Sequence, residues 1–375
     1  MPTKHPKPLM DFMGEIKDPR RPSNGTLHDF REILVIAILA VLSDCNTVEH
    51  IADWAKNHKD WLRQFLRLDR GVPSQDTFLR ILRAIDPRQF EKVFRRWVWG
   101  AAPELSGTVA IDGKTVRGSG SAGEMAIHMV SAFTTRFGLV LGQEKVAEKS
   151  NEITAIPELL KALDLKGLLV SIDAMGCQKT IARLIMDQKA DYLLAVKNNQ
   201  PALFAAIEEA FIGCAALPVS DRYRHAKKAH GRIIGQTTTV LSAKDIIDTA
   251  QWAECKTIGR IDTLRYTNGK SSELEQRYYI SSRVLTAEQL AAHARSHWGI
   301  ENQLHWVLDV IFAEDASTVR TDNAPENFSL LRKIALNLLQ LHRGDDKAKS
   351  NLKLLRKRIA WNPDLCAEIF GLQPL

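Results

Sequence analysis

The stretch Val109-Ala-Ile-Asp-Gly-Lys-Thr-Val-Arg117 decides the fold of this chain, because a short apolar run rich in β-branched residues ends there on a single acid, Asp112. The same arrangement recurs at Leu169-Val-Ser-Ile-Asp-Ala174, where Asp173 ends the run. Short apolar runs of this kind are typical of buried strands. Two acids at the ends of two strands predict a metal site, since carboxylate oxygens are good ligands for divalent cations such as Mg²⁺.

A third acid, Glu301, falls inside a helical stripe later in the chain. Apolar and small side chains recur there at positions 287, 291, 294, 298, 304, 308 and 312, and Thr286 stands where a helix cap is expected. A carboxylate on a buried helix face is costly unless a positive group meets it. The sequence therefore predicts a two-metal site, with Asp112 between the ions and with Asp173 and Glu301 each holding one ion.

Three other acids compete for the role of Glu301. They are Asp309, Glu314 and Asp315, and Asp309 is the strongest competitor because it borders the same stripe. Each acid taken alone is more often a turn or cap residue than a ligand. The joint occurrence of two strand-end acids and one helical acid favours a site.

The order of elements between residues 108 and 196 predicts a ribonuclease-H-like fold. Three strands come first, followed by a helix, a strand, a helix and a strand, over the ranges Thr108–Asp112, Ile127–Phe133, Gly138–Val146, Ile153–Leu163, Leu168–Asp173, Gln178–Lys189 and Asp191–Val196. A meander followed by parallel crossovers favours a mixed sheet with helices on both faces. The first and fourth strands are then neighbours, so Asp112 and Asp173 are expected side by side.

Changes of pattern along the chain predict four segments. We expect an N-terminal helical DNA-binding domain, the first part of an RNase-H-like catalytic core, a β-rich insertion, and the second part of the core with C-terminal helices, over residues 1–105, 106–200, 201–284 and 285–375. Ser74 and Asp86 are predicted helix caps in the first segment. Tyr266-Thr-Asn-Gly269 has the composition of a hairpin turn in the insertion.

Composition restricts the class of protein. The 375 residues are 45% hydrophobic, and the net charge of +7 modestly favours a polyanionic partner. The cysteines are scattered without zinc spacing, which is typical of reduced thiols in the cytoplasm. The longest apolar run, Ile33 to Leu42, is about half of the ~20 residues that cross a bilayer. These features predict a soluble, cytoplasmic protein.

Several basic side chains are candidate DNA contacts. Arg80 and Arg83 share one helix face, which favours either a helix-turn-helix-like domain or an ordinary solvated face, with equal weight. Lys114 and Arg117 are placed to meet phosphates, although surface cations are common. Lys197 begins a polar segment that either holds a strand end or forms a plain turn.

The helix around Glu301 carries further candidates. His297 and His305 lie one turn before and one turn after the acid, where they either contact DNA or fill a helix interface. Trp298 and Trp306 lie on or near the apolar stripe, and we expect both in the core rather than stacked on bases.

Two nucleotide-binding motifs are excluded. The segment Gly118-Ser-Gly-Ser-Ala-Gly123 matches a dinucleotide fingerprint, but a strand pattern rather than a helix follows it. Gly113-Lys-Thr resembles the end of a phosphate-binding loop, but the preceding residues have strand-like character. Neither motif has the structural context that its chemistry requires.

Four motifs resemble the H-repeat-associated transposases, a bacterial insertion-sequence family of the DDE class. They are Ile111-Asp-Gly-Lys-Thr-Val-Arg-Gly118, Glu148-Lys-Ser-Asn-Glu-Ile-Thr-Ala-Ile-Pro-Glu-Leu-Leu160, Ile172-Asp-Ala-Met-Gly-Cys-Gln-Lys179 and His297-Trp-Gly-Ile-Glu-Asn-Gln-Leu-His-Trp-Val-Leu-Asp-Val310. The resemblance extends over about residues 10 to 360.

The resemblance implies Asp112, Asp173 and Glu301 as the acid triad, with two Mg²⁺ or Mn²⁺ ions. It implies double-stranded DNA as partner, as element ends and as target, and a homodimer in the synaptic complex at the bacterial nucleoid. Related transposases carry Tyr, Arg and Lys where this chain has Ala294, His297 and Leu308. Their phosphate contacts are expected from Arg295, Arg332 or Lys333, or are absent.

Two other functions are compatible with the same residues. One is a non-mobile nuclease of the same fold, which hydrolyses DNA without joining it. The other is a non-catalytic DNA-binding relic of a transposase, which binds sequence without metal-dependent chemistry.

Overall fold

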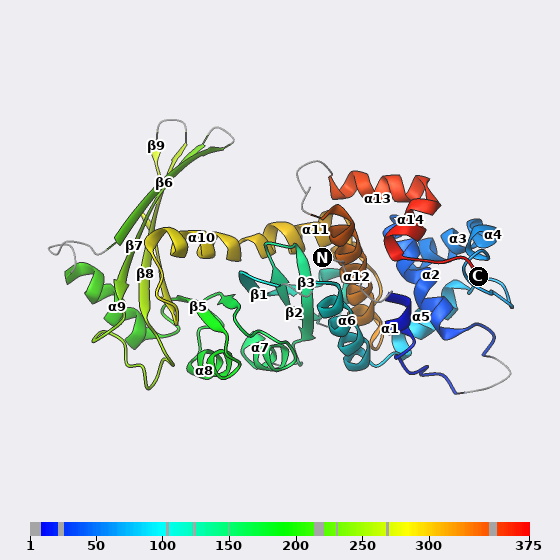
Figure 1. The fold of residues 1–375 in the computed structure, drawn as a ribbon, viewed down its shortest axis with the longest axis horizontal. Coiled ribbons are helices and arrows are strands. Elements are labelled where there is room, and N and C mark those ends of the chain that lie inside the picture. Colours follow the sequence, from blue (N-terminus) through cyan, green and yellow to red (C-terminus); the bar gives the residue numbers. More distant parts are fainter. Residues whose placement is uncertain are drawn as a thin grey trace, which may run out of the picture.

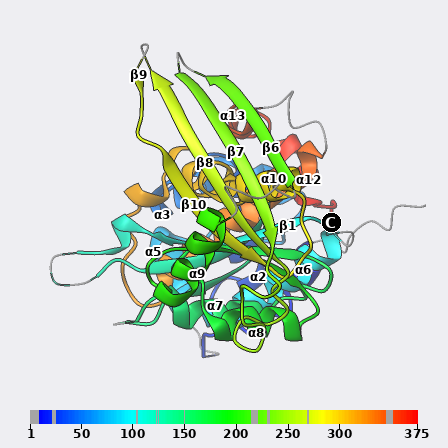
Figure 2. The ribbon, with the colours of Figure 1, turned by 90° about the vertical axis from the view of Figure 1, so that its left-hand side faces the viewer.

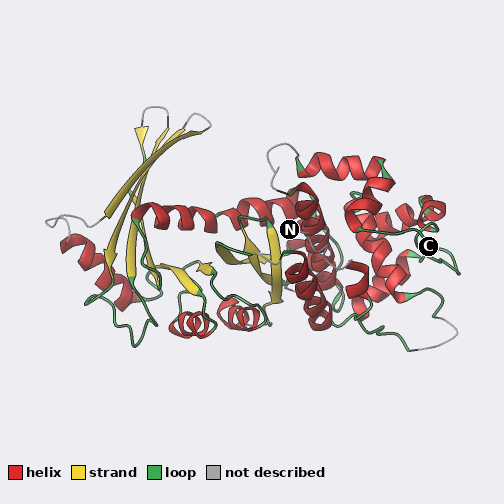
Figure 3. Cartoon of the chain, in the orientation of Figure 1, coloured by secondary structure: helices red, strands yellow, loops and turns green. Residues whose placement is uncertain are grey.

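The computed structural model describes residues 9–21, 26–102, 105–121, 123, 125–148, 150–213, 221–229, 232–267, 270–344 and 351–375. The chain forms an elongated molecule with helices at one end, a sheet with flanking helices in the middle, and a strand-rich end (Figure 1). The colouring by secondary structure shows this division from right to left (Figure 3).

The described chain between residues 9 and 102 is mainly helical, as predicted. The helices are α1 (Leu9–Met13), α2 (Phe30–Leu42), α3 (Val48–Asn57), α4 (Lys59–Leu62), α5 (Gln75–Ala84) and α6 (Pro87–Ala101). The Ser74 side chain caps α5 by accepting from Thr77 N, and the Asp86 side chain caps α6 by accepting from Arg88 N. Both predicted caps are confirmed. The helix α2 is buried on nearly every side, which makes it the core of this end.

The central sheet has the predicted ribonuclease-H-like topology. Its strands β1 (Thr108–Thr115), β2 (His128–Thr134), β3 (Leu139–Lys145), β4 (Leu169–Ile172) and β5 (Asp191–Val196) lie in the order β3-β2-β1-β4-β5. The first three strands form an antiparallel meander, and β4 and β5 run parallel to β1. Because this order makes β1 and β4 neighbours, the predicted pairing of the first and fourth strands is confirmed.

Helices cover both faces of this sheet, which confirms the predicted fold class. The helices α7 (Glu152–Lys161) and α8 (Lys179–Asp187) lie on one face, and α10 (Ala287–His297) lies along the other (Figure 1). The predicted cap of α10 is a capping box, in which Thr286 and Gln289 exchange side-chain to backbone hydrogen bonds. A buried cluster that includes Leu290 and Ala294 seals α10 against the sheet.

The strand-rich segment continues the same sheet. Its strands β6 (Asp221–Ala229), β7 (Arg232–Ser242), β8 (Thr257–Thr267), β9 (Lys270–Ser271) and β10 (Glu275–Ser281) extend the order as β5-β10-β8-β7-β6, with β9 paired to β8. All pairs in this part are antiparallel. Figure 2 shows the long strands rising beyond the helices. The predicted turn residues Asn268 and Gly269 lie outside the described residues.

Two elements of this segment, a helix and a strand, have weak sequence patterns. The helix α9 (Pro201–Gly213) buries Leu203, Ile207 and Phe211, but its alanines blur the helical stripe. The strand β6 reads Asp-Arg-Tyr-Arg-His-Ala-Lys-Lys-Ala, which lacks apolar alternation. A charged strand is typical of a sheet edge, where charges discourage further pairing. An apolar alternation therefore does not reveal the strand β6 in the sequence.

The C-terminal helices pack against the N-terminal helices. The chain passes from α11 (Trp306–Val310) into α12 (Ala324–Arg343), α13 (Leu352–Trp361) and α14 (Pro363–Phe370). Arg356 of α13 is buried, and its guanidinium lies 4.1 Å from the centroid of the Phe312 ring and donates to the carbonyl of Val41 at 2.6 Å. A cation in this position links α13, α2 and the chain after α11.

A glycine pair provides a test of the packing of α10 on the sheet. A Cβ at Gly259 of β8 would lie 2.3 Å from Leu290 Cδ1, whereas no described atom lies within 4 Å of a Cβ at Gly235 of β7. We predict that Gly259→Ala lowers the free energy of unfolding by about 1–3 kcal/mol through overpacking. Gly235→Ala should leave it unchanged or slightly raised. Urea unfolding of both variants checks this, and equal midpoints would contradict the packing.

Candidate active site

The register of β1 with β4 brings two of the predicted acids together. Ile111 pairs with Ile172 in the parallel ladder, so Asp112 and Asp173 follow side by side. Asp173 comes directly after β4, whereas β1 continues past Asp112 to Thr115 through its pairing with β2, so the predicted strand end at Asp112 is wrong. Both acids line one cavity of about 370 Å³. Asp173 also accepts a hydrogen bond from Met175 N at 3.0 Å, which fixes the loop after β4.

The third predicted acid, Glu301, lines the same cavity. It begins a π-helical turn, Glu301–His305, between α10 and α11. Wide turns of this kind are rare and occur frequently at functional sites, because the extra residue rotates the following side chains. The structure therefore gathers Asp112, Asp173 and Glu301 around one space from three distant parts of the chain.

The rest of the cavity wall is mostly apolar and aromatic. Its other lining residues are Ser171, Ile172, Ala174, Leu193, Ala195, Val196, Lys197, Phe204, Glu275, Gln276, Arg277, Tyr278, Tyr279, Ala294, His297 and Trp298. A charged group beside such a wall is poorly solvated, so charges at the acid end of the cavity interact more strongly than they would in water.

Asp112 shows the effect of this environment most clearly. Burial above all, together with the negative charges of Glu152, Asp173 and Glu301, raises its pKa to about 7, although a hydrogen bond from Gly113 N acts in the opposite direction. A carboxyl group surrounded by like charges favours either a proton or a cation. The site therefore has the electrostatic character of a cation site.

Two histidines border the acids. The Nδ1 atom of His305 lies 3.6 Å from Asp112 Oδ2, and burial together with the charges of Lys333 and Lys114 lowers the His305 pKa to about 4. The Nδ1 atom of His297 shares a hydrogen bond with Ser171 Oγ at 3.1 Å, and burial lowers the His297 pKa as well. Both rings are therefore neutral at physiological pH.

The donor set fits a hard divalent cation. Asp112, Asp173 and Glu301 offer carboxylate oxygens, which are ligands that Mg²⁺ and Mn²⁺ accept. Within the described parts of the chain, no group of three His, Cys, Asp or Glu side chains is already close enough to hold one ion. The three carboxylates would therefore have to draw together around an ion.

Two further polar residues, His128 and Glu152, lie next to the site. His128 Nε2 lies 2.7 Å from Glu152 Oε1, and Gly113 leaves the room for this pair, because a Cβ there would lie 2.2 Å from Glu152 Oε1. Sequence patterns pointed to Glu152 as a neighbour of the site, through its polar helix start, but gave no signal for His128. Only the antiparallel pairing of β1 with β2 brings His128 close.

The predicted phosphate contact of Lys114 is not available in this structure. Its ammonium group forms ion pairs with Asp309, Glu314 and Asp315 at 2.7 to 3.1 Å, and its side chain is 11% exposed. The three acids that competed with Glu301 are thus engaged with a lysine. Arg117, by contrast, is 83% exposed and only loosely paired with Asp315 at 3.6 Å.

The remaining predicted DNA contacts divide into two groups. Lys197 and His297 line the cavity. The segment after Lys197 holds the loop that follows Asp173, because Asn199 Nδ2 donates to the Ala174 carbonyl at 2.6 Å. Arg80 and Arg83 lie on α5 at the helical end, where Arg83 pairs with Asp322 at 2.8 Å.

The expected burial of two tryptophans is wrong. Trp298 is 39% exposed and Trp306 is 54% exposed. The stripe positions after the π-helical turn, Leu304, Leu308 and Phe312, are buried as expected. Trp306 stands two residues from Leu304 and two from Leu308, which turns it to the other side of the helix. Trp298 lies at the cavity, with the Arg277 guanidinium 4.4 Å from its ring centroid.

Two expected substitutes for missing phosphate contacts are also wrong. Arg332 and Lys333 are 1% and 2% exposed, so neither reaches solvent. Arg332 lies over the Phe328 ring at 3.9 Å, and Lys333 donates to Ser329 Oγ at 3.3 Å. Arg295, the third expected substitute, is exposed on α10.

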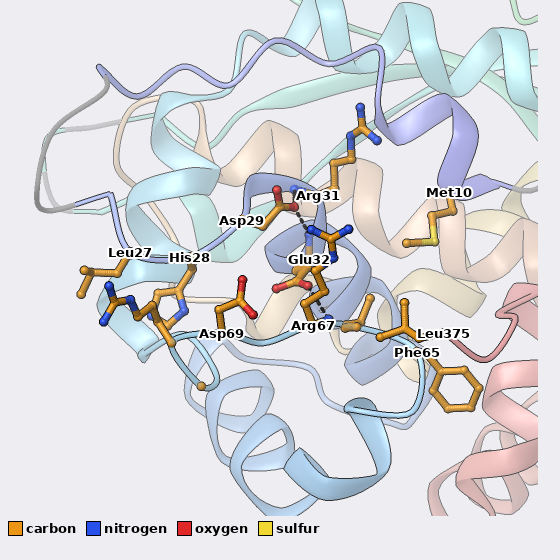
Figure 4. Close-up of a pocket in the computed structure, with 13 residues that line it drawn as sticks. Met10, Leu27, His28, Asp29, Arg31, Glu32, Phe65, Arg67, Asp69 and Leu375 are labelled. Carbon is orange, nitrogen blue, oxygen red and sulfur yellow. Dashed lines mark hydrogen bonds between the residues drawn. The ribbon is translucent and has the colours of Figure 1, made fainter.

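A second cavity lies among the N-terminal helices. It has a volume of about 430 Å³, and Figure 4 shows acidic and basic side chains mixed around it. Glu32 Oε1 accepts hydrogen bonds from the backbone N–H groups of Arg67 and Leu68, so this acid holds a turn. The balanced charges favour neither a cation nor a phosphate. Asp112, Asp173 and Glu301 do not line this cavity.

The family follows from comparison with known proteins. Residues 104–338 match the family model described as Transposase DDE domain, and residues 10–98 match the model described as DDE_Tnp_1-associated. The chain belongs to the DDE transposase family. The expected resemblance to the H-repeat-associated transposases is confirmed.

Close relatives of this DDE family member come from Escherichia coli. "Putative transposase YncI" of strain O157:H7 is 41% identical over 375 residues, which cover 97% of this chain and 94% of that protein. "H repeat-associated putative transposase YhhI" of strain K12 is 40% identical over 374 residues, which cover 97% and 98%. A piggyBac transposase synaptic complex with hairpin DNA aligns with a TM-score of 0.47 and 12% identity, over 96% of this chain and 78% of that chain, which is too distant to assign residues.

Among the described residues of this DDE transposase family member, no helix is both long and apolar enough to span a membrane.

The raised pKa of Asp112 gives a pH-dependent prediction. Below the ordinary pKa of Asp, near 4, the carboxyl group is protonated in the folded and in the unfolded chain, and the fold carries no penalty from it. As the pH rises from about 4 to about 7, only the unfolded chain ionises freely, so the free energy of unfolding falls. We predict that Asp112→Asn raises the melting temperature by roughly 3 °C at pH 8 but by little at pH 4. Differential scanning calorimetry in EDTA checks this.

The matched control for this prediction is Asp60→Asn, because the Asp60 side chain is 97% exposed. Its melting temperature should follow that of the unmodified protein at both pH values. If Asp112→Asn changed the melting temperature equally at pH 4 and pH 8, the carboxyl group would not experience the charges described above.

Proposed function

We propose that this DDE transposase binds the ends of its own element, cleaves a phosphodiester at each end, and joins the freed 3′-hydroxyl groups to target DNA. The convergence of Asp112, Asp173 and Glu301 on one cavity is the observation that carries the proposal. Membership of the family supports double-stranded DNA as the substrate.

The proposed cofactor is a pair of Mg²⁺ or Mn²⁺ ions. Asp112, Asp173 and Glu301 would hold these ions through their carboxylate oxygens. Such ions, when bound, activate an attacking hydroxyl and stabilise the leaving 3′ oxygen. Burial and, to a lesser extent, the neighbouring acids raise the pKa of Asp112, which supports this assignment because a bound cation offsets both effects.

The two reactions are the same exchange at phosphorus. In cleavage, a water oxygen bonds to phosphorus while the bond to the 3′ oxygen breaks. In joining, the freed 3′ oxygen bonds to a target phosphorus while the target's own 3′ oxygen leaves. Phosphodiester bonds are conserved in joining, so the protein has to supply position and electrostatics rather than energy.

The neutral histidines have a distinct role in this scheme. His305 lies beside Asp112, and His297 is held by Ser171, so both limit the space around the acids without adding charge. Lys197 directly follows β5 and lines the cavity. Together with the exposed Arg117 and Arg295, it is available to bind DNA phosphates.

The other segments complete the proposal. Residues 1–105 recognise the element ends, 106–200 and 285–375 form the catalytic core, and 201–284 form an inserted part that extends the sheet. Two ends must be cut together, so two copies of the chain are expected in the synaptic complex. The DNA substrate of the protein would be the chromosome, so the protein would act in the bacterial cytoplasm, at the nucleoid.

Cleavage of DNA that carries the element ends tests the acid triad. We predict that Glu301→Gln lowers Mg²⁺- or Mn²⁺-dependent cleavage by at least ~100-fold, because a neutral amide is a poor ligand. Sequence-specific DNA binding should be retained. The matched control is Glu288→Gln, which removes an exposed carboxylate from the first turn of α10.

The outcomes separate the competing functions. Undiminished cleavage by Glu301→Gln would remove this residue from the triad. Cleavage without joining of precut ends would identify a nuclease instead of a transposase. Specific binding by the unmodified protein without any cleavage would identify a DNA-binding relic.

The role of α5 can be tested through salt dependence. Arg80→Ala combined with Arg83→Ala should weaken binding to all sequences alike and reduce the slope of log affinity against log salt by about 2. Lys161→Ala is the control, since Lys161 is an exposed residue of α7 on the catalytic core. An unchanged slope in the double variant would mean that α5 presents an ordinary solvated face.

A further inference from the structure

Lys114 lies at a position that connects two parts of the proposed active site. It follows Asp112 by two residues on β1, so both side chains leave the same face of the sheet. The Lys114 ammonium nitrogen lies 2.7 Å from Asp309 Oδ1, 3.1 Å from Glu314 Oε2 and 2.9 Å from Asp315 Oδ1. Three carboxylates therefore converge on one cation.

All three partners belong to the chain segment that follows Glu301. The π-helical turn that begins with Glu301 runs directly into α11, which carries Asp309. Glu314 and Asp315 form the short 3₁₀ turn after it. A helical rod is stiff along its axis, so an anchor at its end also fixes the position of the acid at its start.

We infer that Lys114 is a positioning residue that holds the segment bearing Glu301 at a fixed distance from the strand bearing Asp112. The inference rests on the proposed function, in which these two acids share the metal site. Lys114 itself touches neither DNA nor the reacting atoms. It acts through the helix that it anchors.

The burial of this ion-pair cluster supports an anchoring role. Glu314 is buried and accepts a hydrogen bond from Ser329 Oγ of α12 at 2.8 Å. Burial alone would raise the Glu314 pKa, but the charges of Lys333, Arg332 and Lys114 outweigh it and hold the pKa below its usual value. A buried carboxylate that stays ionised cannot easily release its cation.

The backbone around Gly118 provides independent support. A Cβ at Gly118 would lie 2.2 Å from the carbonyl oxygen of Ser317 and 2.6 Å from that of Asp315. Arg117 N donates to Asp315 Oδ1 at 3.2 Å, and Arg320 Nε donates to the Gly118 carbonyl at 3.1 Å. The chain after β1 and the chain after α11 are therefore in direct contact along several residues.

The other end of the rod is fixed by a separate contact. Thr135 and Ser296 share a hydrogen bond, and a Cβ at Gly299 would lie 2.7 Å from Thr135 Cγ2. The segment from Gly299 to Asp315 is thus held at both ends against the meander of the sheet. Removal of Lys114 would free one end and leave three carboxylates facing one another.

Lys114→Met in the full-length chain tests the inference by two measurements without DNA. We expect amide hydrogen exchange within residues 301–310 to rise at least 10-fold, while exchange in β4 stays unchanged. We expect the affinity for Mn²⁺, measured by isothermal titration calorimetry, to fall at least 10-fold. Exchange does not depend on metal, so absent Mn²⁺ binding in the unmodified protein would contradict the proposed function alone.

Arg283→Met is the matched control, because Arg283 also bridges chain segments of this sheet. It pairs with Asp191 at 2.6 Å and donates to the Gly167 carbonyl at 2.8 Å, at the opposite end of the parallel strands. This variant should lose stability without changing exchange in residues 301–310 or Mn²⁺ affinity. Equal changes in both variants would show that Lys114 contributes only general stability and would overturn the inference.

Two milder variants keep the test decisive if Lys114→Met does not fold. Lys114→Arg keeps the charge and should retain most of the protection of residues 301–310. Asp315→Asn neutralises one of the three partners and should raise exchange there to a smaller extent than loss of the lysine. Exchange at the unmodified rate in Asp315→Asn, together with unchanged Mn²⁺ affinity, would also overturn the inference.

Discussion

Main-chain pairing between β1 and β4 is the interaction on which the rest of the proposed site depends. The parallel ladder fixes Ile111 opposite Ile172, and Asp112 and Asp173 follow these two residues. Two carboxylates without a cation between them repel one another, so the main chain has to keep these two together. The cost of their proximity falls on the sheet, whose buried hydrogen bonds and apolar neighbours outweigh it.

The same short strand uses carboxylates in two opposite ways. Around Asp112, acids gather in a buried place, and burial together with their charges raises the pKa of Asp112. Two residues later, three acids gather around Lys114 and are neutralised. The acids around Asp112 are suited to bind a cation from solution, whereas the acids around Lys114 form ion pairs within the chain. Their separation by a single residue lets one strand organise both.

The sequence predicts those features that depend on local pattern and on simple topology. The run before Asp112 and the order of strands are sufficient to predict that Asp112 and Asp173 are neighbours. The position of Glu301 follows from its helical stripe and from the family resemblance. The exposure of Trp298 and Trp306 was mispredicted because nearness to an apolar stripe does not show whether a side chain borders a cavity, as Trp298 does, or faces away from the core, as Trp306 does. The partners of Lys114 lie almost two hundred residues away, and no local pattern encodes such a contact.

The pairing of β10 with β5 has a consequence for how this architecture can change in evolution. The return strand β10 covers the edge of β5, while the charged strand β6 forms the outer edge of the sheet. A deletion that removed the strand-rich segment together with β10 would uncover an apolar edge, Leu193 to Val196, that is prone to pair with other chains. Shortened copies of such a gene would therefore tend to aggregate rather than persist as smaller folded proteins.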